Sequence, residues 1–255
     1  MKSTPKKIIS LVPSQTELLH YLGLENEVIG ITKFCIHPLE WYRTKVKVGG
    51  TKIINFKTIQ QLQPDLIIAN KEENLKEEIE SLLQLYPVHI TDVNNLTEAY
   101  EMIKEIGKIT KTSTKAKALI EKIKNNLYNF QSLISEKKPK TVCYLIWKEP
   151  YMTVGSNTFI NEMLVVAGFT NVFKDKLRYP QITLEELIEK QPDYIFLSSE
   201  PYPFKEKHII ELQKNAPELT SKMVLVDGEI FSWYGSRMLH SADYFKQLVT
   251  ELSIL

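Results

Sequence analysis

One long amphipathic helix is predicted at the centre of this chain, over 112–136, and it constrains the fold more than any other stretch. Its apolar residues recur at three- and four-residue steps, which places them on one face of a helix. At 1.5 Å per residue, about 25 residues span roughly 37 Å, the width of a small domain. Lys137, Lys138 and Pro139 end the helix, because proline cannot continue it. Such a helix is either an ordinary surface helix or a spine between two domains.

Short apolar strands alternate with helices on both sides of this helix. The predicted strands are 7–12, 28–34, 66–69, 88–91, 141–147, 194–197 and 223–226. This alternation favours parallel sheets with helices on both faces. The expected organisation is an N-terminal α/β lobe over 1–111, a connecting helix over 112–138 and a C-terminal α/β lobe over 139–255.

One motif occurs on both sides of the long helix: a helix, then Gln-Pro-Asp, then a buried strand. The first copy reads TIQQLQPDLII from Thr58, and the second begins TLEEL at Thr183 and continues with QPDYIF after three more helical residues. Both strands lead into acidic loops. The repetition predicts two Rossmann-like lobes joined by the long helix. A ligand would then bind in a cleft beyond the carboxyl ends of the strands.

Composition excludes several classes of protein. The chain has 255 residues, an apolar fraction of 43% and a net charge of +1, so it can bury a sizeable core, and its charge gives no electrostatic case for binding nucleic acid. Two cysteines do not form a disulfide framework. No apolar run reaches the length of a membrane span, and the N-terminal apolar run is too short for a signal peptide. As written, the chain is expected to be cytoplasmic, or to be a form whose export segment lies outside it.

Several stretches in order resemble a known family. They are ISLVPSQTE at Ile9–Glu17, VIGIT at 28–32, VGG at 48–50, LQPDLII at 62–68, FINEML to Ala-Gly at 159–168, and 187–196. The chain resembles the class III, helical-backbone substrate-binding proteins of ABC importers, which are receptors for cobalamin, ferric siderophores and haem. The cobalamin receptors are the most similar in appearance.

The resemblance covers nearly the whole chain, and it implies a binding protein without catalysis. No cofactor is required, and the bound molecule would be a transported corrinoid, haem or ferric siderophore. An ABC permease dimer would be the partner, and a monomer is expected. Family members are periplasmic or lipid-anchored outside the cell. A cytosolic protein on the same fold that binds or senses a corrinoid or haem is the alternative.

Candidate ligand-binding residues follow the predicted strands. The three tryptophans all fall at strand ends or in the loops after them, which favours a flat, partly apolar ligand such as a macrocycle. Each could instead pack in the core. Ser14 could cap its helix or help bind an anion there, and Arg237 could meet an anionic group or pair with Asp243. The set is Ser14, Phe34, Cys35, His37, Trp41, Asn70, Lys71, Trp147, Tyr151, Trp233, Tyr234 and Arg237.

Cys35 and His37 carry the chemical alternatives. Both could ligate a soft metal or the axial position of a corrin or haem, or they could be a buried thiol and a solvent-facing histidine. A third hypothesis is an enzyme with Cys35 as nucleophile, which would need an orienting group that the sequence does not name. Phosphate-binding, dinucleotide-binding and nucleophile-elbow motifs do not occur in the chain. An enzyme is therefore not expected.

Acidic loops after the two Pro-Asp strands are candidates for docking a partner. In the family, the loop after the first Pro-Asp strand lies beside the ligand, and its acidic side docks on the permease. One carboxylate in each lobe could pair with basic sockets on a two-fold symmetric partner, or the charges could simply be solvated. This sequence departs from the family because Lys76 stands at the usual first docking position. The candidates are Glu72, Glu73, Glu77 and Glu200.

Overall fold

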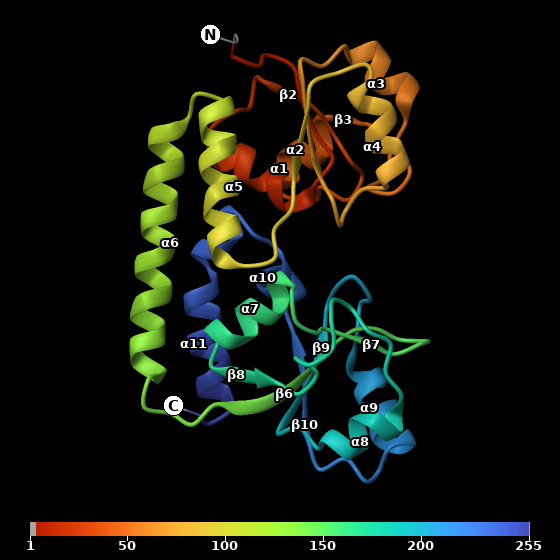
Figure 1. The fold of residues 1–255 in the computed structure, drawn as a ribbon, viewed down its shortest axis with the longest axis vertical. Helices are drawn as coiled ribbons and strands as arrows, with labels where there is room; N and C mark the ends of the chain where they lie inside the picture. The colour runs from red at the N-terminus through yellow and green to blue at the C-terminus, as the bar shows by residue number, and fades with distance from the viewer. Residues whose placement is uncertain (1–3, 255) are drawn as a thin grey trace. The chain divides into compact units, whose positions relative to one another are not determined.

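The computed structural model describes residues 4–254, which fold as two compact units (Figure 1). Unit 1 contains the chain up to Val93, Thr97–Ile123 and Trp233–Leu239. Unit 2 contains Asn94–Leu96, Lys124–Ser232 and the chain from His240 onward. The predicted α/β fold with two parallel-sheet lobes is confirmed. Among the described residues, no helix is both long and apolar enough to cross a bilayer.

Unit 1 is built on a five-stranded sheet in the order β3-β2-β1-β4-β5, and all its strand pairs are parallel. The strands are β1 (Ile8–Ser10), β2 (Val28–Ile31), β3 (Val46–Lys47), β4 (Leu66–Asn70) and β5 (Val88–Thr91). The helices are α1 (Pro13–Tyr21), α2 (Leu39–Thr44), α3 (Phe56–Leu62), α4 (Lys76–Leu83) and α5 (Leu96–Ile109), with the 3₁₀ helix η1 (Ser236–Leu239). The crossover order places the carboxyl ends of β1, β2 and β4 at one edge of the sheet.

Unit 2 is built on a second sheet, in which β6 pairs with β9, β8 and β7, and β10 lies beside β9. Every pair is parallel except β6 with β7, so this sheet carries one antiparallel strand that the sequence did not predict. The strands are β6 (Lys140–Trp147), β7 (Met152–Thr153), β8 (Phe169–Asn171), β9 (Tyr194–Ser198) and β10 (Lys222–Val226). The helices are α7 (Phe159–Val166), α8 (Leu184–Lys190), α9 (Glu206–Asn215), α10 (Gly228–Ser232) and α11 (Ser241–Glu251).

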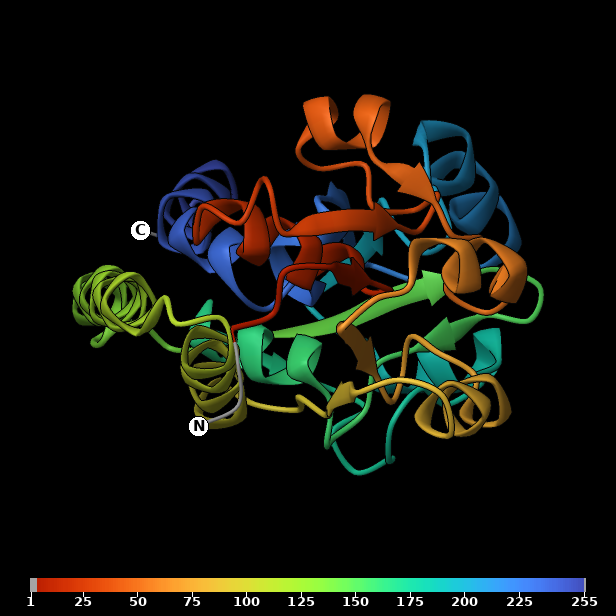
Figure 2. The same ribbon diagram turned by 90° about the horizontal axis from the view of Figure 1, so that it is seen from above.

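Each sheet has a core on both faces, as expected for buried parallel strands. In unit 1, Ile9 and Ile67 pack with Ile59 of α3 and Leu82 of α4 on one face, while α1 and α5 lie on the other (Figures 1 and 2). In unit 2, alternate residues of β6 and β9 pack with Leu187 of α8 and Leu212 of α9. The opposite face is aromatic, with a run of ring contacts through Tyr144, Phe196, Phe231, Phe245 and Phe130.

The long helix is α6, Ser113–Ile134, and it is continuous. The boundary between the two units falls within it, after Ile123. Most residues predicted to form its apolar face are buried: Ala116, Leu119, Ile120, Ile123, Leu127 and Phe130. Leu133, which was also predicted to lie on this face, is 47% exposed, and Ile134 is half-buried. The helix therefore contributes its first half to unit 1 and its second half to unit 2.

The repeated Gln-Pro-Asp has the same structural role in both units. Gln63 and Gln191 end α3 and α8 in the left-handed conformation. Asp65 then accepts hydrogen bonds from the backbone N–H groups of Lys6 and Lys7, at 2.7 and 2.9 Å. Asp193 accepts from the N–H and hydroxyl of Thr141, both at 2.8 Å. In unit 1 the aspartate therefore links the start of β1 to β4, and in unit 2 it links the start of β6 to β9.

Asp193→Asn should lower the free energy of unfolding by about 1 kcal/mol at pH 7, because an amide replaces an ionised acceptor at a partly exposed site. The hydrogen bond from the Thr141 N–H, followed by the Thr141 hydroxyl and Lys140, holds the pKa of Asp193 below its usual range. A depressed carboxyl pKa stabilises the fold above the unfolded pKa, and that contribution is lost as the pH falls through the folded pKa. Urea unfolding at pH 7 and pH 3 should therefore show a difference that shrinks in acid. Asp175→Asn, at an exposed ion pair, is the matched control and should change little.

One local prediction is wrong. Ser14 does not cap α1, because the N-cap is Val12 and Pro13 occupies the first helical turn. Proline has no N–H to leave unpaired and its φ suits this position. Ser14 instead lies inside the helix and is buried. Glu17, on the same helix, pairs with Arg237.

Candidate functional site

The loop after β2 carries a fully buried thiol. The Sγ of Cys35 lies 3.1 Å from the hydroxyl of Thr16 and 3.2 Å from that of Thr32. Burial raises the pKa of Cys35, and the two hydroxyls only partly offset this effect. A neutral, enclosed thiol is a poor nucleophile and a poor metal ligand. Among the described residues, no group of three or more His, Cys, Asp or Glu side chains is arranged to hold a metal ion.

Neither cysteine should react with a thiol reagent such as Ellman's reagent in the native state. Cys143 is also fully buried, and burial raises its pKa to about 12. Because the thiolate is the reactive form, both residues should be protected until the protein unfolds. Two thiols per chain should then react in urea. Rapid labelling of one thiol at neutral pH would show that Cys35 is more accessible and more reactive than its surroundings indicate.

A chain of contacts links His37 to the segment Trp233–Leu239, which belongs to the same unit. The rings of His37 and Trp233 meet edge to face at 5.6 Å. The guanidinium of Arg237 lies over the Trp233 ring at 5.1 Å, and its Nε lies 3.1 Å from a carboxylate oxygen of Glu17. Both charged side chains are mostly buried. Arg237 therefore pairs with Glu17 and not with Asp243, the partner considered from the sequence.

The aromatic candidates in unit 1 differ in exposure. Trp41 lies on α2 and is only 1% exposed, with its ring against His20. Trp233 and Tyr234 are also buried. Phe34, in contrast, is half exposed directly after β2, and its ring lies over Gly50, where an added Cβ would come within 3.2 Å of it. Phe34 is the candidate aromatic in unit 1 that faces solvent at the carboxyl edge of the sheet.

Asn70 organises the loop after β4. Its side-chain amide donates to the carbonyl and the hydroxyl of Thr91, at 3.0 and 3.1 Å. Its side-chain carbonyl accepts from the N–H groups of Glu72 and Glu73. Asn74 closes the loop by accepting from the Asn70 N–H. Since Asn70 is 1% exposed and its amide is already hydrogen-bonded on both sides, its role is to shape the loop.

The charged residues of this loop differ in exposure. Lys71 is exposed and forms an ion pair with Asp92 at 2.8 Å. Glu73 is half-buried, and desolvation raises its pKa although Lys52 lies near enough to lower it. Glu72 is also half-buried, whereas Glu77 is exposed in the first turn of α4. Among these acidic candidates, Glu77 presents the most accessible carboxylate.

The corresponding edge of unit 2 carries an exposed tryptophan. Trp147, at the end of β6, is 41% exposed and meets the ring of Tyr202 edge to face at 5.5 Å. Tyr151 is half-buried beside the core that contains β6 and β9, and burial raises its pKa. Next to Trp147, Lys148 forms an ion pair with Glu211 at 2.6 Å. Glu200, in the loop after β9, accepts a hydrogen bond from Ser232 at 2.6 Å.

The structure also reveals groups that the sequence did not single out. His208 is the clearest of them. In the structure α9 begins at Glu206, and the buried His208 ring lies against Tyr202. The sequence signal for a capping role was the position of His208 at the start of a helix, three residues after Lys205.

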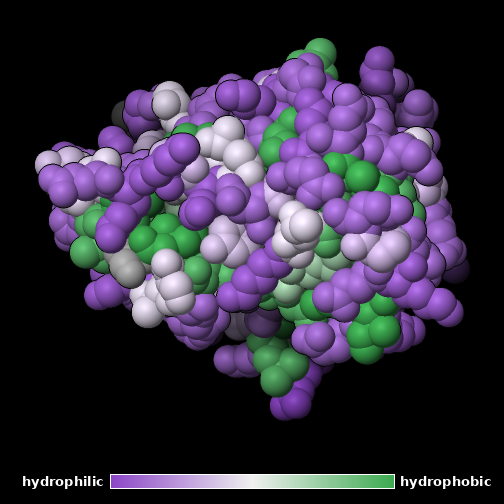
Figure 3. Space-filling model, turned by 90° about the horizontal axis from the view of Figure 1, so that it is seen from below, coloured by the Kyte–Doolittle hydropathy of each residue, from purple (hydrophilic) through white to green (hydrophobic). Residues whose placement is uncertain are grey.

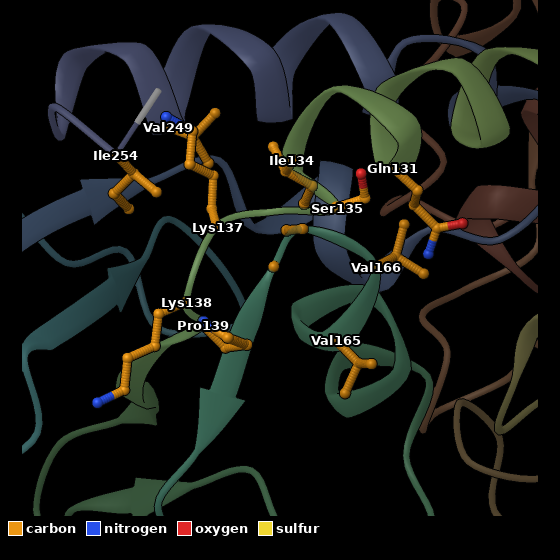
Figure 4. A pocket seen from close by; sticks show the side chains of 12 residues that line it. Gln131, Ile134, Ser135, Lys137, Lys138, Pro139, Val165, Val166, Val249 and Ile254 are labelled. Carbon is orange, nitrogen blue, oxygen red and sulfur yellow. The ribbon is translucent and has the colours of Figure 1, made fainter.

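A separate hollow of about 210 Å³ lies in unit 2. It is lined by the ends of α6, α7 and α11 and by the residues that lead into β6 and β8, including Ile134, Lys138 and Val165 (Figure 4). It therefore lies at the amino ends of these strands, opposite the edge that carries Trp147. On the face seen from below, apolar groups form separate patches among hydrophilic side chains (Figure 3). This hollow is not part of the candidate ligand-binding edge.

Two α/β units with mainly parallel sheets that share one long helix define the class III binding proteins. The fold matches the periplasmic vitamin B12 binding protein of Vibrio cholerae with a TM-score of 0.83, at 23% identity, over 98% of this chain and 97% of that chain. Residues 8–222 match the family described as Periplasmic binding protein. The chain belongs to this family, and the relatives and structures that it matches are named as binding proteins and not as enzymes.

Two relatives show how far the similarity extends. The chain is 33% identical over 204 residues to an uncharacterized ABC transporter substrate-binding lipoprotein of Bacillus subtilis (strain 168). This match covers 76% of this chain and 64% of that protein, so just under two thirds of the relative is spanned. A vitamin B12-binding protein of Vibrio cholerae (strain ATCC 39541) is 25% identical, with 76% of this chain and 70% of that protein covered.

Proposed function

We propose that this protein binds a corrinoid of the cobalamin type, or a similar metal chelate, for an ABC importer. The observation that carries the proposal is the exposed Trp147 ring packed on Tyr202 at the carboxyl edge of the unit 2 sheet. Flat, exposed aromatic rings fixed by neighbours suit the face of a macrocycle at low entropic cost. Phe34 offers a comparable ring at the corresponding edge of unit 1. The B12-binding relatives support the same ligand class.

A titration with cyanocobalamin, haemin and a ferric siderophore tests this proposal. Tryptophan fluorescence should be quenched by the ligand that binds, and isothermal calorimetry should give the same affinity. Trp147→Ala should weaken binding by about tenfold, the cost of one lost aromatic contact. Tyr128→Ala, at an exposed ring on α6, is the matched control and should leave the affinity unchanged. If none of the three ligands binds, the proposal is wrong.

We also propose that an ABC permease docks on carboxylates at these edges. Glu77 is the best candidate in unit 1, because it is exposed where Glu73 is half-buried with a raised pKa. Glu200 is the candidate in unit 2, although Ser232 already hydrogen-bonds one of its oxygens. Co-purification with the permease should be lost in Glu77→Lys and retained in Glu80→Lys, a reversal one turn further along α4. Equal retention by both variants would exclude Glu77.

A further inference from the structure

The side chain of His208, within the first turn of α9, caps the N-terminus of that helix. It is the third residue of the helix and is only 6% exposed. Its Nδ1 accepts a hydrogen bond of 2.9 Å from the backbone N–H of Lys205, the N-cap residue. Glutamate or glutamine usually makes this contact at the third helical position. A histidine can make it only while Nδ1 carries no proton.

The other ring nitrogen connects α9 to the exposed tryptophan. With Nδ1 accepting, the proton of a neutral imidazole is on Nε2, which lies 3.3 Å from the hydroxyl of Tyr202. The His208 ring also meets the rings of Tyr202 and Phe204, at 5.3 and 5.6 Å. Tyr202 in turn supports Trp147. A single imidazole thus holds the loop after β9 against the start of α9 and, through Tyr202, supports the Trp147 ring.

The surroundings of His208 oppose a positive charge. Burial is the main cause that lowers its pKa, and three cations act in the same direction: Lys207, Lys148 and Lys205. Glu211 is the only facing anion among the groups that act on His208, and Lys148 already holds it at 2.6 Å. A cation would also lie at the positive end of the helix dipole. The neutral ring is therefore the form that fits this site.

We propose that His208 is a positioning residue for the ligand-facing Trp147, and that its protonation in mild acid releases Tyr202 and Trp147. A proton from solvent would occupy Nδ1, so the N–H of Lys205 would lose its acceptor. The lowered pKa means that the contact is complete above the unfolded pKa of about 6.5 and is lost as the pH falls through the folded value. That this movement changes ligand affinity rests on the proposed function.

Fluorine NMR of protein labelled with 5-fluorotryptophan tests the positioning without any ligand. The three tryptophan resonances can be assigned with Trp147→Phe. In the wild type, the Trp147 resonance should shift between pH 8 and pH 5 with one midpoint below about 6.5. In His208→Asn, the amide oxygen can take the place of Nδ1 and cannot be protonated, so this shift should disappear. His240→Asn, at an exposed histidine, is the control and should titrate like the wild type.

Two results would overturn the proposal: a Trp147 resonance that does not change with pH in the wild type, or one that changes identically in His208→Asn. The protection factor of the Lys205 amide, which should fall in acid in the wild type, gives a second measurement that needs no variant. With cyanocobalamin as the probe, affinity should fall about tenfold from pH 7.5 to pH 5 in the wild type and stay constant in His208→Asn. If cyanocobalamin binds at neither pH, the ligand assignment fails, while the NMR titration still decides the role of His208.

Discussion

Asn70→Ala is expected to lower the free energy of unfolding by roughly 3–4 kcal/mol, because it removes four hydrogen bonds from a buried site and leaves their partners unsatisfied. The lost bonds are the two donated to Thr91 and the two accepted from the N–H groups of Glu72 and Glu73. For a chain of this size, thermal unfolding should begin roughly 6–16 °C lower. Differential scanning calorimetry and urea unfolding at pH 7 measure the effect.

The same substitution at Asn55 is the matched control. Asn55 is exposed, and its side chain accepts one hydrogen bond, from the N–H of Thr58 at the start of α3. Losing such a cap costs about 1 kcal/mol. Asn70→Asp separates the two halves of the Asn70 network, since it keeps the acceptor for Glu72 and loses the donors to Thr91. Equal effects of Asn70→Ala and Asn55→Ala would mean that the loop after β4 does not depend on Asn70.

The fold could be predicted from the sequence because its signals are local and repeated. Hydrophobic periodicity located α6 to within two residues at each end, and β5 was placed at its observed bounds. The Gln-Pro-Asp repeat identified two similar lobes, because in each unit the aspartate links the first strand to the strand that follows the motif. Short elements such as α2 and β7 were missed, because six and two residues carry too little periodicity to distinguish them from loops.

Predicting the candidate site was harder, because side-chain partners depend on contacts between distant parts of the chain. Trp41 was predicted at a strand end or in the loop after it, yet it lies on α2 and its ring is buried. Asn70 was also placed correctly, but its hydrogen bonds go to a neighbouring strand and its own loop. Arg237 pairs with Glu17 across 220 positions, a contact that spacing alone cannot reveal. The position of a residue in the sequence therefore predicted whether it lies near the carboxyl edge of a sheet. It did not predict whether its side chain faces solvent or the core.

Arg237→Ala should destabilise unit 1 by about 3 kcal/mol or more, because it leaves the mostly buried carboxylate of Glu17 without its guanidinium partner. The side chains of Arg237 and Glu17 are 15% and 20% exposed, so solvent replaces little of the lost interaction. The contact with the Trp233 ring is lost as well. Chemical denaturation followed by circular dichroism measures the change. Amide exchange within Trp233–Leu239 should rise in the same variant.

A double-mutant cycle separates the ion pair from general packing. Glu17→Gln and Arg237→Met each break the pair, so the double variant should be less destabilised than the sum of the single variants, with a coupling of about 1–3 kcal/mol. Arg237→Lys keeps the charge but loses the planar guanidinium over Trp233, so it should restore only part of the stability. Additive effects would show that Glu17 and Arg237 contribute independently. A coupled result would mean that Arg237 stabilises the segment Trp233–Leu239 through Glu17, and that an anionic group of a ligand would have to compete with Glu17 for the same guanidinium.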